Sequence, residues 1–196
     1  MPDSVYLLPG RGGSLDRGLG EELSARGFRV FGRELRGDFG KLAFGEQVET
    51  VADDMRSGFW TGRARVVANS FGAYLFLQAQ AMSEPFPGMA LLLSPIVGEA
   101  QDGERMAFFV PPRAGGLREL IHSGRYPAPA CCQAHVGELD WQSAPEKVAE
   151  FGKLAGISVT VVPGAGHALP KEYVRAVLDR WLGGPDRQCG TPSAEH

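Results

Sequence analysis

Short runs of β-forming residues alternate along this chain with longer stretches in which apolar residues recur every three or four positions. A short run bounded by turn residues indicates a strand, and the longer spacing indicates a helix with one buried face. Strands that are separated by helices run parallel within one sheet. The pattern therefore predicts an α/β fold, a three-layer α/β/α sandwich in which crossover helices cover both faces of the sheet.

Both kinds of element have boundaries that the sequence marks. The expected strands are Ser4 to Leu8, Phe28 to Phe31, Arg63 to Ala68, Met89 to Leu93, Cys132 to Val136 and Ile157 to Val162. The expected helices are Leu15 to Arg26, Gly45 to Ser57, Phe71 to Met82, Gly116 to His122, Pro145 to Ala155 and Lys171 to Leu182. In the first helix, Ser14 is suited to cap the N-terminus and Gly27 to end the helix.

The 196 residues are enough for one sizeable core, and we expect a single domain over residues 1–182. Residues 98–129 are the least regular part, and they would form a small cap whose Met106, Phe108 and Phe109 offer an apolar wall, or else an irregular connection. Residues 183–196 show no periodic apolar face and are expected to be a mobile C-terminal tail.

Composition excludes several classes of protein. The net charge of −3 argues against a nucleic-acid partner, and no apolar run approaches the roughly 20 residues that cross a bilayer. The first residues include Asp3 where a signal peptide carries basic residues. Three cysteines, two of them the adjacent pair Cys131 and Cys132, give no disulfide framework and are expected to be mostly reduced thiols. We therefore expect a soluble, cytoplasmic protein.

A serine lies at a predicted strand-to-helix turn, in the sequence Ala68-Asn69-Ser70-Phe71-Gly72. Such a turn is typical of a nucleophile elbow, in which a strained backbone makes the serine hydroxyl project from the sheet. The elbow needs small residues two positions before and after the serine. Ala68 and Gly72 are both small, although Ala68 stands where the usual pattern has glycine and so departs from it by one methyl group.

A serine hydroxyl is a weak nucleophile and needs a histidine base. His167 follows the last predicted strand in a glycine-containing loop, which can turn back over the carboxyl edge of the sheet. His135 lies inside a predicted strand, His122 near a helix end, and His196 at the C-terminus. His167 is therefore the candidate base.

The base in turn needs an acid that orients it, and the acid should follow the penultimate strand. Asp140 stands there, in Gly137-Glu138-Leu139-Asp140. The order Ser70, Asp140, His167 is the order expected for a nucleophile elbow of this type. Glu138 is the nearest alternative, and Glu99 or Asp102 would supply the acid in a less common arrangement.

Backbone amides are expected to bind the oxyanion that forms during acyl transfer. The amide of Phe71 follows the nucleophile, and the amide of Gly10 or Arg11 lies in the glycine-rich loop after the first strand. This loop does not fit the G-x-G-x-x-G dinucleotide pattern, because Leu15 stands where the third glycine would be.

Together these segments resemble the α/β-hydrolase superfamily in its compact, nearly lidless form, from about Ser4 to Leu182. The segments that carry the resemblance are the Pro9-Gly10-Arg11-Gly12 loop, the Ser70 pentapeptide, Leu93-Ser94-Pro95, the turn that ends at Asp140, and Gly164-Ala165-Gly166-His167. The resemblance implies a six-stranded sheet in the order 2-1-3-4-5-6.

The same resemblance implies a serine hydrolase that acts through an acyl-enzyme on a small, ester-like substrate. Such chemistry needs no metal and no organic cofactor, and a carboxylesterase is the plainest form of it. A thioesterase or an acyltransferase would use the same residues. A non-catalytic protein-binding module that retains the fold is the alternative from another class.

Overall fold

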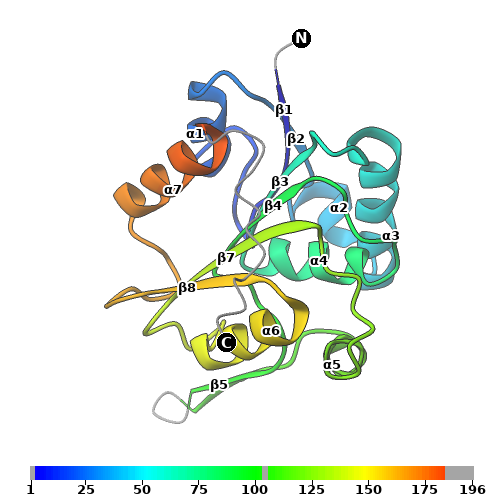
Figure 1. The fold of residues 1–196 in the computed structure, drawn as a ribbon, viewed down its shortest axis with the longest axis vertical. Coiled ribbons are helices and arrows are strands. Elements are labelled where there is room, and N and C mark those ends of the chain that lie inside the picture. The colour runs from blue at the N-terminus through cyan, green and yellow to red at the C-terminus, as the bar shows by residue number, and fades with distance from the viewer. Residues whose placement is uncertain (1–2, 103–105, 184–196) are drawn as a thin grey trace, which may run out of the picture.

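The computed structural model describes residues 3–102 and 106–183, in which a parallel sheet lies between two layers of helices (Figure 1). The strands of this sheet are β1 (Ser4–Leu8), β2 (Arg29–Gly32), β3 (Arg65–Asn69), β4 (Met89–Leu93), β7 (Cys131–Gly137) and β8 (Ser158–Val162). Their order is β2-β1-β3-β4-β7-β8, and every neighbouring pair is parallel. This arrangement confirms the predicted sandwich and the predicted strand order.

Alternate residues of each strand supply two separate cores. In β1, Val5 and Leu7 belong to one hydrophobic cluster, whereas Tyr6 and Leu8 belong to the other. Helices α1 (Leu19–Ala25) and α7 (Lys171–Gly183) cover the first face. Helices α3 (Phe44–Asp54), α4 (Phe71–Gln80) and α6 (Pro145–Ala155) cover the second face (Figure 1).

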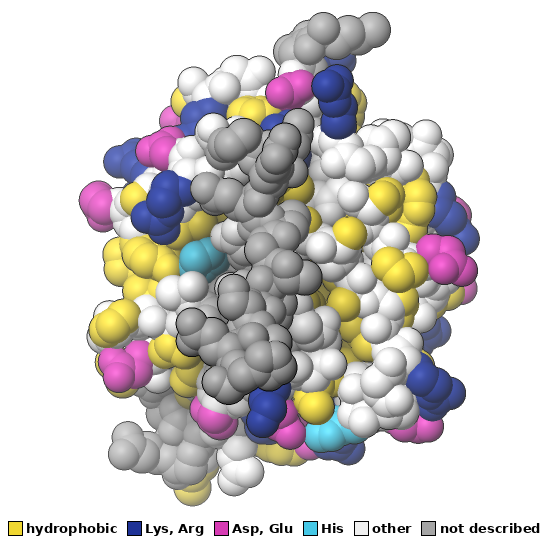
Figure 2. All heavy atoms as spheres, viewed as in Figure 1, with side chains coloured by type: hydrophobic (Ala, Val, Ile, Leu, Met, Phe, Trp, Pro, Cys, Tyr) yellow, Lys and Arg dark blue, Asp and Glu magenta, His cyan; other side chains and the backbone are white. Residues whose placement is uncertain are grey.

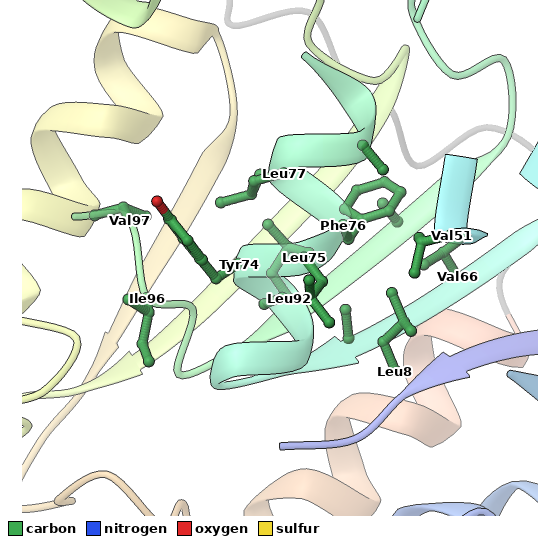
Figure 3. Close-up of a cluster of buried hydrophobic side chains, with 14 of the residues drawn as sticks. Leu8, Val51, Val66, Tyr74, Leu75, Phe76, Leu77, Leu92, Ile96 and Val97 are labelled. Carbon is green, nitrogen blue, oxygen red and sulfur yellow. The ribbon is translucent and has the colours of Figure 1, made fainter. Parts of the chain in front are cut away.

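Helix α4 is the centre of the larger core. All ten of its residues are buried, which agrees with a sequence that is apolar except for Gln78 and Gln80. Figure 3 shows Tyr74, Leu75, Phe76 and Leu77 of this helix among apolar residues of the strands and of α3. The helix that follows Ser70 is therefore held firmly against the sheet.

The first helix differs from the prediction at its start. It begins at Leu19 rather than Leu15, and Gly18 is its N-cap, so the assignment of Ser14 as the cap was wrong. The Leu15 N–H donates to Glu34 Oε1 at 2.7 Å, which holds this part of the chain outside the helix. A long-range hydrogen bond thus overrides the local capping preference.

Two short elements in the first half of the chain were not predicted. The helix expected at Gly45 to Ser57 is α3 followed by one π-helical turn, η1 (Met55–Phe59). Helix α2 (Gly37–Lys41) has only five residues. So short a helix shows no clear apolar period and leaves no signal for a periodicity argument.

The irregular segment 98–129 contains a hairpin and a helix. Strands β5 (Ala100–Asp102) and β6 (Ala107–Phe109) pair in an antiparallel way, and α5 (Ala114–His122) follows them. The Tyr74 hydroxyl donates to the carbonyl oxygen of Pro112 at 2.5 Å. This bond joins the segment to the buried helix α4, so the segment is packed against the core that supports Ser70.

The cysteines differ in their state. Cys132 is a free thiol whose pKa is raised by burial, but Cys131 is disulfide-bonded, so the prediction of reduced thiols was wrong for Cys131.

Gly183 ends α7 and is not part of a tail, and residues 184–196 lie outside the described residues. None of the described helices is both long and apolar enough to span a bilayer. Figure 2 shows charged side chains of both signs interspersed over one face.

Stability in acid should depend on His135, which is buried in β7 and bonded through Nδ1 to the Tyr173 hydroxyl at 2.8 Å. Burial, with a smaller contribution from Arg180, lowers the pKa of His135 to about 4. Between pH 6.5 and 4 the unfolded chain binds a proton at this residue and the folded chain does not. The free energy of unfolding should therefore fall with pH in this window, by at most about 1.4 kcal/mol per pH unit.

Urea unfolding of H135N at pH 7.0, 5.5 and 4.5 tests this expectation, because asparagine offers a polar group near Nδ1 but does not titrate. The variant should lose less stability than the wild type between pH 7.0 and 4.5. H122N is the matched control, since the His122 side chain on α5 is half exposed. An H135N protein that loses as much stability as the wild type would contradict the assignment.

Candidate active site

Ser70 lies at the junction of β3 and α4 in a conformation that is rare for a serine. Its φ of 54° and ψ of −121° lie outside the regions that residues with a side chain favour. Such a conformation costs on the order of 1–3 kcal/mol and persists only where the surroundings impose it. Here the Ser70 N–H donates to the carbonyl oxygen of Leu93 at 2.9 Å, which joins the turn to β4.

The residues around Ser70 must be small because β1 and α4 approach each other closely. A Cβ atom on Gly72 would lie 2.1 Å from the carbonyl oxygen of Leu8. A Cβ atom on Gly10 would lie 3.0 Å from the Cβ atom of Ser70. Ala68 is completely buried. The steric requirement expected for the serine turn is therefore strict at Gly72, and Ala68 fits its own position.

His167 meets Ser70 from the loop after β8. The distance from Ser70 Oγ to His167 Nε2 is 2.8 Å. Gly164 in this loop has a φ of 66° and follows a proline, a combination that favours a tight turn. The Ser94 hydroxyl donates to the carbonyl oxygen of His167 at 2.8 Å, so the end of β4 fixes the histidine backbone.

Asp140 contacts the other side of the imidazole. Both of its carboxylate oxygens lie 2.9 Å from His167 Nδ1, and its side chain is 0% exposed. The backbone N–H groups of Gln142 and Ser143 also donate to Asp140 Oδ1, each at 3.0 Å. An ionised carboxylate only accepts hydrogen bonds, so the Nδ1 of His167 carries the proton. The Nε2 lone pair then faces the Ser70 hydroxyl.

The alternative acids lie elsewhere or have other partners. Glu138 accepts a hydrogen bond from the Gly164 N–H at 2.8 Å, and this bond fastens the histidine loop. Glu99 forms an ion pair with Arg118 at 3.6 Å. Asp102 is part of β5, and its side chain is outside the described atoms. The structure thus brings Asp140, and neither Glu138 nor Glu99, to His167.

The other histidines are similarly separate from Ser70. His135 is bonded to Tyr173, and His122 lies 3.9 Å from Glu150 in an ion-pair arrangement on the surface. His196 lies outside the described residues. Among the described histidines, His167 alone contacts the serine.

The two candidate oxyanion donors come from different loops. Phe71 is the first residue of α4, so its N–H has no acceptor within the helix. The carbonyl oxygen of Gly10 accepts a hydrogen bond from the Gly13 N–H at 2.9 Å. Because a trans peptide points its C=O and N–H in opposite directions, the N–H of Arg11 points away from that turn. The turn therefore leaves the Arg11 N–H available as a candidate second donor.

A cavity of about 360 Å³ opens beside the serine. It is lined by Gly10, Arg11, Asn69, Ser70, Phe71, Ile96, Phe109, Gln142, His167 and Ala168. Phe109 of β6 brings the 98–129 segment into this wall. Met106 and Phe108 are 92% and 66% exposed and do not line the cavity. The apolar wall expected from three residues of the segment is therefore provided by one of them.

The sequence matches no family model and no curated protein, but the fold is similar to that of many solved structures. A monoacylglycerol lipase from Paleococcus ferrophilus superposes with a TM-score of 0.66 at 14% identity, covering 91% of this chain and 93% of the lipase. The mouse alpha/beta hydrolase domain-containing protein 10 gives 0.65 at 15% identity, covering 92% and 89%. A carboxylesterase structure from Nitrososphaera gargenis gives 0.61 at 15% identity, covering 93% and 89%.

The chain has the α/β-hydrolase fold. In this fold the carboxyl ends of parallel strands meet at one edge of the sheet, and loops from that edge carry the site. Here β3 leads to Ser70, β7 leads to Asp140 and β8 leads to His167. The fold thus accounts for how three residues distant in sequence meet.

Sequence reasoning gave no role to two serines that support the site of this α/β-hydrolase fold, although Ser94 lies in a segment that carries the resemblance. The Ser143 hydroxyl donates to the carbonyl oxygen of Ser94 at 2.7 Å and lies 3.5 Å from His167 Nδ1. Ser94 has a φ of 43° and holds the histidine backbone, as described above. Ser143 stands three residues after Asp140, a spacing typical of side-chain turns, but that spacing gives no hint of its long-range partners.

The contact at Gly72 makes a prediction about stability. G72A should lower the free energy of unfolding by about 3 kcal/mol, because its Cβ atom would overlap backbone atoms of β1 that cannot move without disturbing the sheet. Urea unfolding measures the change. G98A is the control, because a Cβ atom at Gly98 meets nothing within 4 Å. Equal midpoints for the two variants would refute the close approach.

Proposed function

We propose that this protein is a serine hydrolase that cleaves carboxylic ester or thioester bonds of a small substrate. The proposal rests above all on the continuous series of hydrogen bonds from Ser70 through His167 to the buried Asp140. This series ends at a cavity large enough for a small acyl group. The esterase and lipase names of similarly folded proteins agree with the proposal.

In the proposed reaction, the Ser70 oxygen attacks the carbonyl carbon of the ester, and His167 Nε2 takes the proton of the hydroxyl. The carbonyl π electrons move to the carbonyl oxygen, which becomes an oxyanion. The backbone N–H groups of Phe71 and Arg11 donate hydrogen bonds to it. Asp140 stays ionised and stabilises the imidazolium, because it is already bonded to Nδ1 and to two backbone amides.

The tetrahedral intermediate then collapses, and the alcohol leaves with the proton that His167 donates. The acyl group remains on Ser70 as an ester. Water enters, gives a proton to His167 and attacks the acyl carbon, and a second collapse releases the acid and restores the Ser70 hydroxyl. Every protein group in these steps is a side chain or a backbone N–H of this chain.

An alkyl fluorophosphonate tests the nucleophile directly, since it reacts with an activated serine and leaves a stable covalent mass. The wild type should be labelled at Ser70, and S70A should not be labelled. H167A should react at least about a hundredfold more slowly, because the general base is lost. Intact-protein mass spectrometry and peptide mapping measure both effects.

S57A is the matched control for this experiment. Ser57 is an exposed serine of η1 whose hydroxyl donates to the carbonyl oxygen of Asp54, and it does not line the cavity. S57A should be labelled as fast as the wild type. A folded wild type that takes no label, and hydrolyses no nitrophenyl ester, would favour a binding module in place of an enzyme.

The role of Asp140 can be separated from its contribution to folding. In D140N the side-chain oxygen can still accept from the Gln142 and Ser143 N–H groups, but the amide nitrogen would donate to His167 Nδ1. That arrangement places the imidazole proton on Nε2, where it cannot accept the Ser70 proton. We expect kcat for 4-nitrophenyl butyrate to fall about a thousandfold while the unfolding midpoint changes little. Unchanged turnover would remove Asp140 from the mechanism.

A further inference from the structure

One fixed charge lies in the wall of the cavity beside Ser70. Arg11 is the only Arg, Lys, Asp or Glu among the described residues that line it. Asp140 lies behind His167 and is 0% exposed, so its charge does not reach the cavity surface. A substrate in this cavity would therefore meet a positive side chain on a wall that is otherwise neutral or apolar, apart from the imidazole.

The guanidinium of Arg11 has no acidic partner among residues 3–102 and 106–183. Its side chain takes part in none of the ion pairs within the described part of the chain, whereas the arginines of the neighbouring β2–α2 region, Arg33 and Arg36, are paired with Asp54 and Glu34. What Arg11 does contact is the ring of Phe71, with its Cζ atom 4.4 Å from the ring centroid. The residue as a whole is exposed.

Stacking of this kind orients a guanidinium without consuming its hydrogen bonds. The contact with a ring uses the face of the planar group, and the N–H donors lie at its edge. Those donors match two oxygens of a carboxylate or a phosphate. Because an arginine stays protonated at any ordinary pH, Arg11 presents a permanent positive charge beside the reacting serine.

A second arginine extends the positive charge along the same row of rings. The Phe44 ring lies 6.1 Å from the Phe71 ring, and Arg113 Cζ lies 6.0 Å from the Phe44 centroid. Like Arg11, Arg113 forms no ion pair with any described residue. Arg113 does not line the cavity, so it adds positive charge behind the Phe44 ring while Arg11 remains the fixed charge of the described cavity wall.

We propose that Arg11 selects substrates that carry a negatively charged oxygen group, such as a carboxylate, several bonds from the scissile ester. The inference rests on the proposed serine hydrolase function and names its substrate class. The anionic group would lie on either the acyl chain or the alcohol, and the guanidinium would bind it in either case. Arg11 would thus act through its side chain in specificity and through its backbone N–H in catalysis.

The first arm of the test places the charge on the acyl chain. The 4-nitrophenyl half-ester of adipic acid carries a carboxylate, and the matching half-amide ester of the same length is neutral. The wild type should favour the charged ester by about tenfold in kcat/KM, as expected for a partly exposed charged hydrogen bond. In R11M this preference should vanish. Rates with S70A are subtracted as the background.

The second arm places the charge on the alcohol, by comparing 4-carboxyphenyl acetate with 4-carbamoylphenyl acetate. In each arm, kcat/KM for the charged ester is divided by kcat/KM for the neutral ester. This ratio for the wild type is then divided by the same ratio for R11M, so effects of the leaving group and of the backbone at residue 11 cancel. The arm with the larger quotient shows whether Arg11 binds a charge on the acyl chain or on the alcohol of the substrate. Raising the ionic strength from about 0.02 M to 0.5 M should reduce that quotient, because salt screens an exposed charge.

R29M is the matched control. Arg29 also lies over a ring, 5.4 Å from the Phe31 centroid, forms no ion pair with any described residue, and does not line the cavity. R29M should keep the preference of the wild type. Ser70-dependent turnover without a preference for charge in either arm would overturn the role of Arg11 and leave the hydrolase function intact. Absence of any Ser70-dependent turnover or labelling would overturn both.

Discussion

The close approach of α4 to β1 determines the geometry of the whole site. Gly72 lets the helix lie against the carbonyl oxygen of Leu8, and the helix is buried on every side. Between the end of β3 and this fixed helix there is room for only one residue, Ser70, and it adopts a strained conformation as a result. The strain is therefore a consequence of packing, and the surrounding core maintains it.

The other two side chains depend on hydrogen bonds between loops. The ends of β4, β7 and β8 are joined through Ser94, Ser143 and Glu138, and each of these bonds links a loop to a neighbour distant in sequence. His167 is thus fixed at its backbone as well as at its ring. Because each loop is positioned by the next, the placement of His167 depends on all of these links together.

Features that depend on residues close together in the sequence could be predicted, and features that depend on contacts between distant residues could not. The strands were predictable because burial on two faces gives apolar runs, whereas their order came only from the resemblance to a known superfamily. The turn at Ser70 and the positions of Asp140 and His167 also follow from local sequence. The start of α1, the links through Ser94 and Ser143, and the stacking of Arg11 on Phe71 depend on partners that only the tertiary structure reveals.

The placement of charge connects the proposed chemistry with the proposed specificity. Asp140 is buried behind His167, and Arg11 lies at the cavity wall, so the resting site carries one negative charge inside and one positive charge outside. Transfer of the Ser70 proton adds an imidazolium and an oxyanion, and the total charge does not change. The negative charge of Asp140 has its own hydrogen-bond donors and, after the proposed proton transfer, the imidazolium, whereas the positive charge of Arg11 has no counterpart among the described residues. Under the specificity proposed here, a negatively charged substrate would supply that counterpart.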